Sequence, residues 1–290
     1  MTAATTDPGL SGDNQPDRHR SALVSLVPFR EAPATMIDRI AAVLDVFLGY
    51  PSLPLVEVAR RAQLPPSSTH RLLQALVELG WIERDGFDYA LGLRLFELGS
   101  QAVQRRGLRE TALPVISRLH RQTGCTAYLS TLVDADILHL ERVGLWPRGS
   151  ASWDVGARQP AQLSAAGHAL LAARTPDTWP SLSFAAKPTC YSVRSRTQLD
   201  REIQRTRDRG GVAVDSQGCT LGVTVIAAAV DTFAPNCQLA LSLCGPTPSV
   251  SNAALIAAVR RGVAEIRAAV TRIPATRHRI LPSPPAVRLI

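Results

Sequence analysis

Residues 55–84 read LVEVARRAQLPPSSTHRLLQALVELGWIER, and this stretch decides the fold of the N-terminal part of the chain. Apolar spacing predicts a short helix over residues 55–63. Residues 64–66 form a turn, because the two prolines cannot continue that helix. A second helix follows, capped by one of the serines at 67 and 68, and ends before Gly80. Its predicted buried stripe is Leu72, Leu73, Leu76, Val77 and Leu79.

The flanking segments complete a recognisable unit. Apolar residues at helical spacing predict another helix over 36–50. Residues 81–84 and 87–91 resemble two short strands around Asp85-Gly86, which is a strong hairpin signal. A further helix is predicted over 93–106. The order helix, helix, turn, helix, hairpin is that of a winged helix-turn-helix.

Polar side chains on the helix that starts at 67 predict a DNA-binding face. They lie near the helix N-terminus, where a recognition helix meets base edges and where phosphate is favoured. The preceding helix ends in two arginines, and a third lies by the hairpin. The candidate DNA contacts are Arg60, Arg61, Ser67, Ser68, Thr69, His70, Arg71, Gln74 and Arg84. The alternative is a protein-interaction module with a solvated polar face.

These residues resemble the DNA-binding domain of the IclR-type transcriptional regulators. The residues that carry the resemblance are Leu64-Pro65, Ser67, His70-Arg71-Leu72-Leu73, Gly80-Trp81 and Leu91-Gly92. Two positions depart from the family pattern: Gln63 stands where a turn glycine is usual, and Pro66 replaces a basic residue. Pro66 removes one potential phosphate contact.

The second half of the chain is similar to the same family, in order and spacing. The matching stretches are QLSAAGHALLA (162–172), GGVAVD (210–215), LGVTVIAAAV (221–230) and ALSLCGP (240–246). The resemblance therefore covers about residues 36–272. It implies an α+β chain, in which an N-terminal winged helix-turn-helix precedes a GAF-like α/β effector-binding domain.

The residues of this half support alternating strands and helices. A hairpin is expected from segments 127–133 and 137–143, and strands from 212–214, 223–230 and 238–243. Ser164 is expected to cap a helix that runs through Ala173. Two more helices are expected over 197–209 and 249–271. A sheet with helices on its faces gives a layered domain.

The family resemblance implies an effector pocket in this half. Small residues at a helix start let a ligand approach backbone amides, which suits a carboxylate. A strand serine and cysteine two residues apart share one face, and an aspartate could accept a ligand hydroxyl. The candidate contacts are Ser164, Ala165, Ala166, Gly167, Asp215, Val225, Ser242 and Cys244. Ordinary capping and core packing are the alternatives. Departures from the family at Gln162, His168 and residues 216–218 leave open another effector or a ligand-independent regulator.

Composition limits the function further. The chain has 290 residues and a formal net charge of +8, and every basic residue except Lys187 is arginine. Lys187 follows two alanines, so it belongs to no phosphate-binding P-loop. The five cysteines are odd in number and form no CxxC pair, which favours reduced thiols over disulfides or zinc. Residues 36–110 carry 9 basic and 9 acidic groups, so the charge excess lies elsewhere.

These observations divide the chain into five segments. We expect residues 1–34 to form a disordered arm, 35–92 the winged helix, 93–108 a linker helix, 109–273 the effector domain, and 274–290 a Pro- and Arg-containing tail. The absence of a signal peptide and of an uninterrupted apolar span predicts a cytoplasmic protein without membrane contact.

The expected function is a transcriptional regulator that binds a palindromic DNA operator as a dimer or tetramer and senses a small organic acid. Two rival functions are an enzyme and a metal sensor. No GxSxG, HExxH or GxGxxG sequence occurs, and the histidines are dispersed. His139 with Glu141, or Cys219, could bind a metal, but no ligand cluster surrounds them. We therefore expect no catalytic residue, no metal site and no cofactor.

Overall fold

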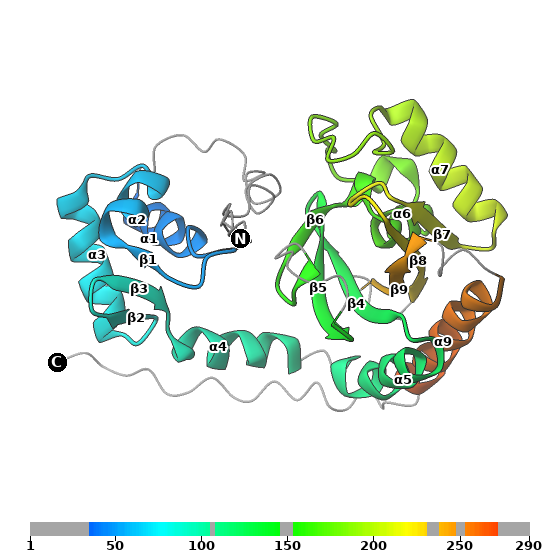
Figure 1. Cartoon of the computed structure of the whole chain (residues 1–290), viewed down its shortest axis with the longest axis horizontal. Helices are drawn as coiled ribbons and strands as arrows, with labels where there is room; N and C mark the ends of the chain where they lie inside the picture. The colour runs from blue at the N-terminus through cyan, green and yellow to red at the C-terminus, as the bar shows by residue number, and fades with distance from the viewer. Residues whose placement is uncertain (1–34, 105–107, 146–152, 231–237, 248–252, 272–290) are drawn as a thin grey trace, which may run out of the picture.

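The computed structural model describes residues 35–104, 108–145, 153–230, 238–247 and 253–271 (Figure 1). The predicted arm 1–34 and tail 274–290 lie outside the described residues. The described part comprises a small helical unit at the N-terminus and a larger domain built around a sheet, with helix α4 (Leu93–Gln104) running between them (Figure 1).

The N-terminal unit has the predicted order of elements. Helices α1 (Met36–Asp45), α2 (Leu55–Ala62) and α3 (Pro66–Glu78) precede the hairpin of β2 (Ile82–Asp85) and β3 (Asp88–Leu91). An additional short strand, β1 (Leu53–Pro54), pairs with β3 and gives the sheet order β1-β3-β2. Its apolar core consists of Val43, Phe47, Leu53, Val58, Ala62, Leu64, Leu72, Leu73, Leu76, Ile82 and Tyr89. The winged helix-turn-helix prediction is confirmed.

Helix α3 differs in detail from the prediction. It begins at Pro66 rather than at a serine cap, and Pro65 precedes it without a side-chain cap. Proline suits the first helical position because its missing N–H would have no partner there. Leu79 was expected in the buried stripe, but it lies after the last helical residue and is 62% exposed.

The end of α3 fixes where the wing begins. Gly80 has a φ of +71°, and its N–H donates to Val77 O, while the N–H of Trp81 donates to Leu76 O. This pair of bonds is the Schellman motif, in which a left-handed residue closes a helix. It turns the chain so that Trp81 leads directly into β2.

The C-terminal domain is built on a fully antiparallel six-stranded sheet in the order β6-β5-β4-β9-β8-β7. The strands are β4 (Thr126–Val133), β5 (Asp136–Val143), β6 (Arg158–Pro160), β7 (Val212–Ser216), β8 (Val223–Val230) and β9 (Leu239–Pro246). Strands β4 and β9, which are distant in sequence, pair at the centre. Local signals predicted the β4–β5 hairpin, but they did not predict this pairing.

Helices cover both faces of the sheet (Figure 1). α5 (Leu108–Thr123) and α9 (Ala253–Thr271) pack on one face, against the leucines of β9. α6 (Ala165–Ala172) and α7 (Arg196–Asp208) lie on the other face. The start of α6 after Ser164 agrees with the prediction, whereas α5 was not expected from the sequence. The domain is therefore a three-layer arrangement with two separate apolar cores.

Two further properties bear on function. Within the described ranges, no helix is long and apolar enough to cross a membrane. Cys125, Cys190, Cys219 and Cys244 are free thiols, and all but Cys190 are buried.

The left-handed turn at Gly80 gives a testable stability prediction. Gly80→Ala should lower the free energy of unfolding by about 1 kcal/mol, because a side chain disfavours a positive φ. Gly99→Ala is the matched control: Gly99 lies inside α4, and an added methyl there meets nothing within 4 Å. That change should leave stability unchanged or raise it. Equal effects of the two substitutions in urea unfolding would contradict the assigned role of the turn.

Candidate DNA-binding and effector-binding sites

The N-terminal half of α3 presents a polar face to solvent. Ser67, Arg71 and Gln74 are exposed and are spaced at i, i+4 and i+7, so they share one side of the helix. Ser68 and His70 are half-buried beside them. These five predicted residues therefore form one continuous surface, the α3 polar face.

Thr69 does not belong to this surface. Its polarity and its place in the same stretch predict a DNA contact. Its side chain is buried, and its hydroxyl donates to Pro65 O at 3.1 Å. A hydroxyl that bonds back to the previous turn of the helix cannot also reach a base edge, so the structure corrects this assignment.

The two arginines at the end of α2 are held by neighbouring side chains. Arg60 donates to the Glu57 carboxylate at 2.8 Å, and this hydrogen bond lowers the pKa of Glu57. Arg61 donates to the same carboxylate at 3.1 Å and to the Tyr50 hydroxyl at 2.8 Å. Its guanidinium also lies 4.2 Å above the Tyr50 ring. Both groups are exposed and oriented, as a phosphate contact requires.

Arg84 lies on the wing. Its Nε donates to Gly86 O at 2.9 Å, which ties the side chain to the hairpin turn. Phe87 follows in that turn and is largely exposed. The wing thus carries one cation and one exposed ring at its tip.

The candidate effector residues of the strands lie in register on one face of the large sheet. Asp215 of β7 pairs with Val225 of β8, and Val225 pairs with Cys244 of β9. Cys244 in turn pairs with Thr126 of β4. Ser242 lies two residues from Cys244 and therefore on the same face. The register therefore brings together Asp215, Val225, Ser242 and Cys244, which the family resemblance implies share one site.

The other four candidates lie around the start of α6, on the same side of the sheet. The Ser164 hydroxyl accepts the N–H of Gly167 at 3.0 Å and so caps the helix. Gly167 packs on Ala161 so closely that a Cβ would fall 2.0 Å from Ala161 O. Ala165 and Ala166 are buried in the apolar core on this side of the sheet. The small residues allow close packing, and the Ser164 hydroxyl is already used within the helix.

Asp215 has the most perturbed carboxyl of this face. Burial raises its pKa to about 7, although backbone N–H groups of Cys219 and Gly218 partly oppose the shift. Burial also raises the pKa of the Cys219 thiol, which donates to Leu163 O at 3.0 Å. Charge is therefore disfavoured here, and Asp215 titrates near neutrality.

Sequence reasoning missed an aromatic cluster on the same face. The rings of Tyr128, His139 and Trp153 are mutual neighbours, with centroids 4.9, 5.9 and 6.1 Å apart. His139 had been considered only as a metal ligand. Among the described residues, however, no group of three or more His, Cys, Asp or Glu side chains could hold a metal ion. The available signal was an alternation of polar residues in buried strands, at Tyr128 and Ser130.

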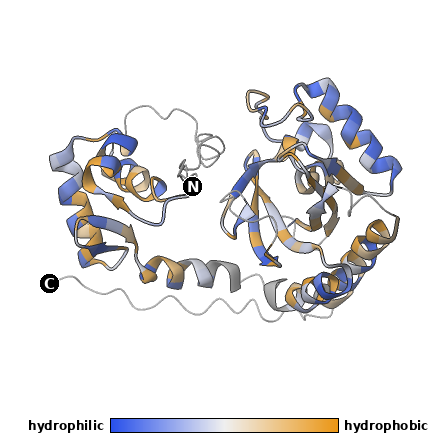
Figure 2. Ribbon diagram, viewed as in Figure 1, coloured by the Kyte–Doolittle hydropathy of each residue, from blue (hydrophilic) through white to orange (hydrophobic). Residues whose placement is uncertain are grey.

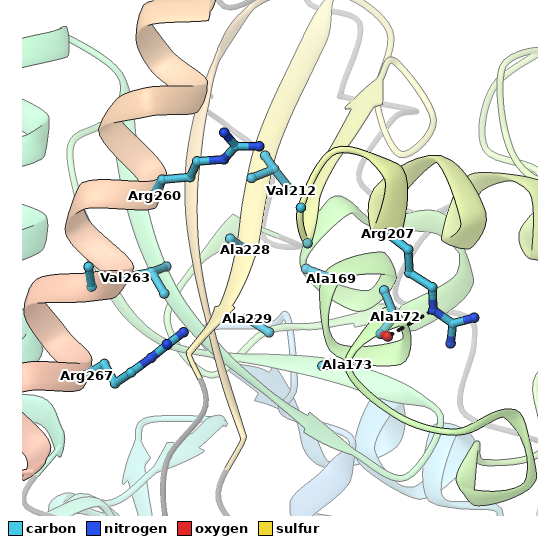
Figure 3. Close-up of a pocket in the computed structure, with 13 residues that line it drawn as sticks. Ala169, Ala172, Ala173, Arg207, Val212, Ala228, Ala229, Arg260, Val263 and Arg267 are labelled. Atoms are coloured by element: carbon cyan, nitrogen blue, oxygen red, sulfur yellow. Dashed lines mark hydrogen bonds between the residues drawn. The ribbon is translucent and has the colours of Figure 1, made fainter.

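A separate cavity of about 420 Å³ lies at the edge of the sheet beside Val212, between α6 and α9 (Figure 3). Three arginines line it, but none of the candidate effector residues does. Arg207 donates to Ala172 O and Arg174 O at 3.2 and 3.1 Å, and Arg260 donates to Arg209 O. These guanidinium groups bind carbonyls at the ends of α6 and α7, as helix-capping arginines do. Two of the three arginines that line the cavity therefore also hold the ends of these helices.

Comparisons with known proteins identify the same two domains. A family described as the IclR helix-turn-helix domain matches residues 36–86, and one described as "Bacterial transcriptional regulator IclR C-terminal" matches residues 100–273. The chain is 31% identical to the regulator BhcR of Paracoccus denitrificans, over 76% of this chain and 81% of that one. It is 27% identical to the repressor IclR of Escherichia coli, over 69% and 76% of the two chains.

A solved structure of an IclR homologue has a similar fold. An IclR homologue from Microbacterium hydrocarbonoxydans, determined with 4-hydroxybenzoate bound, superposes with a TM-score of 0.70 at 25% identity. The match covers 82% of this chain and 99% of that chain.

Two titratable groups, the half-buried Asp215 and the buried His139, predict opposing pH effects on stability. Asp215 has a raised pKa, so its contribution is present at low pH and is lost as the pH rises through about 7. Burial lowers the pKa of His139 to about 4, so its contribution is present above about 6.5 and is lost as the pH falls towards 4. The stabilising effect of Asp215→Asn should therefore be larger at pH 8 than at pH 5, by about 2–3 kcal/mol.

Thermal unfolding of the wild type and the variant at pH 5 and pH 8 measures this difference. Asp177→Asn, at an exposed position of the same domain, is the matched control and should show no such pH dependence. An Asp215→Asn effect that is the same at both pH values would contradict the burial of this carboxyl.

Proposed function

Since the chain belongs to the IclR family of DNA-binding transcriptional regulators, we propose that it binds a palindromic operator as a dimer, through α3 and the wing, and that a small organic acid controls this binding. The α3 polar face is the observation that carries the proposal. It combines an exposed arginine with short hydrogen-bonding side chains at a helix N-terminus.

In this docking, α3 enters the major groove with Ser67, Arg71 and Gln74 towards the base edges. Arg71 is the residue that can bind a guanine edge or a phosphate with two donors. Arg60 and Arg84 flank α3 on α2 and on the wing, where they would contact the DNA backbone. Ser68, His70 and Arg61 complete the proposed contact surface.

The effector is proposed to bind on the sheet face beneath α6. The Asp215–Val225–Cys244 row and Ser242 supply a few polar groups in an apolar layer, which is the usual composition of a ligand site. The homologue bound to 4-hydroxybenzoate supports an organic acid as the ligand class. Binding would change the arrangement of the DNA-binding units, which is a coupling between two sites.

The linker helix α4 is proposed to help form the dimer. Hydrophobic residues occur along α4 (Figure 2). Leu93 and Phe96 lie one turn apart on this helix and are 67% and 69% exposed, and Leu98 is also exposed. Apolar side chains of this size on one short helix favour burial against another protein surface. A second copy of the chain fits, because a palindromic operator requires a two-fold symmetric partner.

We further propose that the protein acts by binding rather than by catalysis, and that it works in the cytoplasm, where its DNA target lies. The buried thiol of Cys219 is bound to a carbonyl, and its pKa lies well above the usual range. A thiol in this state is a poor nucleophile.

Arg71 is the first test of the operator model. Arg71→Ala should weaken binding to DNA from the gene's own upstream region by at least roughly tenfold, because it removes a bidentate base or phosphate contact. The gel shift of the wild type should also weaken steeply as salt rises. Arg201→Ala, on exposed α7, is the matched control and should bind normally. Full operator affinity in the Arg71 variant would count against this docking.

Phe96 tests the dimer. Phe96→Glu places a charge in the proposed α4 contact and should convert the protein towards monomers in size-exclusion chromatography with light scattering. Leu221→Glu, at an exposed apolar position in the effector domain, should leave the oligomeric state unchanged. An intact dimer in the Phe96 variant would show that α4 is not the interface.

A further inference from the structure

We propose that Tyr128 and His139 determine the specificity of the effector site, and that the effector is an organic acid that carries a hydroxyl group bound by both side chains. The inference rests on the proposed effector site and deepens it, because it names residues and a ligand feature that the family resemblance did not indicate.

Two buried polar atoms carry the inference. Tyr128 is 0% exposed and His139 is 2% exposed. Within the described part of the chain, three buried side-chain polar atoms lack a hydrogen-bond partner: the Tyr128 hydroxyl, His139 Nε2 and Gln162 Oε1. An unsatisfied buried polar atom destabilises a fold, and the large majority of such atoms in proteins are paired. A role in binding accounts for the atoms of Tyr128 and His139, whose rings are neighbours.

The two atoms belong to one cluster rather than to scattered defects. The Tyr128 and His139 ring centroids are 4.9 Å apart, and Trp153 packs against both. Tyr128 also lies opposite Ser242 in the β4–β9 register. The unpartnered groups are therefore direct neighbours of a candidate effector contact, on the sheet face that carries Asp215 and Cys244.

The chemistry of the two groups selects a hydroxyl. Ser130 Oγ lies 2.9 Å from His139 Nδ1, so Nε2 is the ring atom left for a ligand. Burial lowers the pKa of His139 to about 4 and keeps the ring neutral, and burial raises the pKa of Tyr128 above its usual value. A neutral imidazole nitrogen either donates or accepts, according to its tautomer. A ligand hydroxyl can donate and accept at once, so it satisfies both groups for either tautomer.

The cluster is also connected to the rest of the site. Trp153 Nε1 donates to Thr220 Oγ1 at 3.4 Å, and Thr220 lies in the loop whose amides bind the Asp215 carboxylate. Trp153 packs against both Tyr128 and His139. A ligand that contacts those two residues therefore also affects Trp153, which is bonded to the loop that holds Asp215. This connection gives the hydroxyl group a route to the regulatory response.

Matched ligands and matched variants test the proposal. Binding of benzoate, 3-hydroxybenzoate and 4-hydroxybenzoate to the full chain is measured by isothermal titration calorimetry. One of the hydroxylated acids should bind wild-type protein roughly tenfold more tightly than benzoate, which is the value of about one buried hydrogen bond. In Tyr128→Phe that preference should fall below about threefold.

Stability separates this role from a structural one. Tyr128→Phe removes an unpartnered hydroxyl, so the Tm of the ligand-free variant should equal or exceed that of the wild type. Tyr89→Phe, in the buried core of the winged helix, is the matched control and should keep the full ligand preference. His139→Leu removes the second group and should also abolish the preference, which provides an independent variant if one substitution impairs folding.

Each outcome decides the question. Equal affinity of all three acids for the wild type would overturn the proposal, while leaving organic-acid sensing intact. A preference that survives in Tyr128→Phe would overturn it as well. If none of the acids binds, both this inference and the proposed effector class fail, and the gel shift still reports operator binding separately.

Discussion

The antiparallel register of β4, β9, β8 and β7 is the constraint on which the effector domain depends. Side chains alternate between the two faces of a strand, so the register decides which residues share a face. On β9, Leu241 and Leu243 pack towards α5 and α9, whereas Ser242 and Cys244 lie on the α6 side. A slip of one residue would exchange the two sets. The same pairing therefore provides both a purely apolar core and a layer that includes polar groups.

The loop between β7 and β8 holds the polar layer together. Hydroxyl groups of Thr189 and Ser192 donate to the carbonyls of Gln217 and Gly218, at 2.7 and 2.8 Å. Trp153 donates to Thr220 on the other side of the loop. Two segments that are distant in sequence, residues 189–192 and Trp153, thus converge on the turn that positions Asp215. The dense bonding explains how Gln217 is kept at a φ of +66°, which a residue with a side chain rarely adopts.

Local chemistry made much of this fold predictable. Prolines, Gly80 and the Asp85-Gly86 pair placed the helices and the wing, and Ser164 correctly marked the start of α6. Two predictions for α3, the role of Thr69 and the capping residue, were wrong for reasons that lie in the helix itself. Thr69 is polar, but its hydroxyl bonds to its own helix, and a proline rather than a serine begins α3. Polar residues at Tyr128 and Ser130 in a buried strand were a signal for a polar site, but the meeting of Tyr128 with His139 and Trp153 depends on tertiary packing that residue patterns do not encode.

Strand β9 is the element through which the two faces of the domain can influence each other. It carries Ser242 towards the α6 side and Leu241 towards the core that includes α5 and α9. A well-packed core transmits displacement because it has few voids to absorb it. Helix α5 follows α4 in the chain, and α4 leads directly from the winged helix. A ligand that moved β9 relative to α5 would therefore act on the helix that spaces the DNA-binding units. The neutral charge balance of residues 36–110 fits this arrangement, because DNA affinity then depends on where a few arginines are placed rather than on overall attraction.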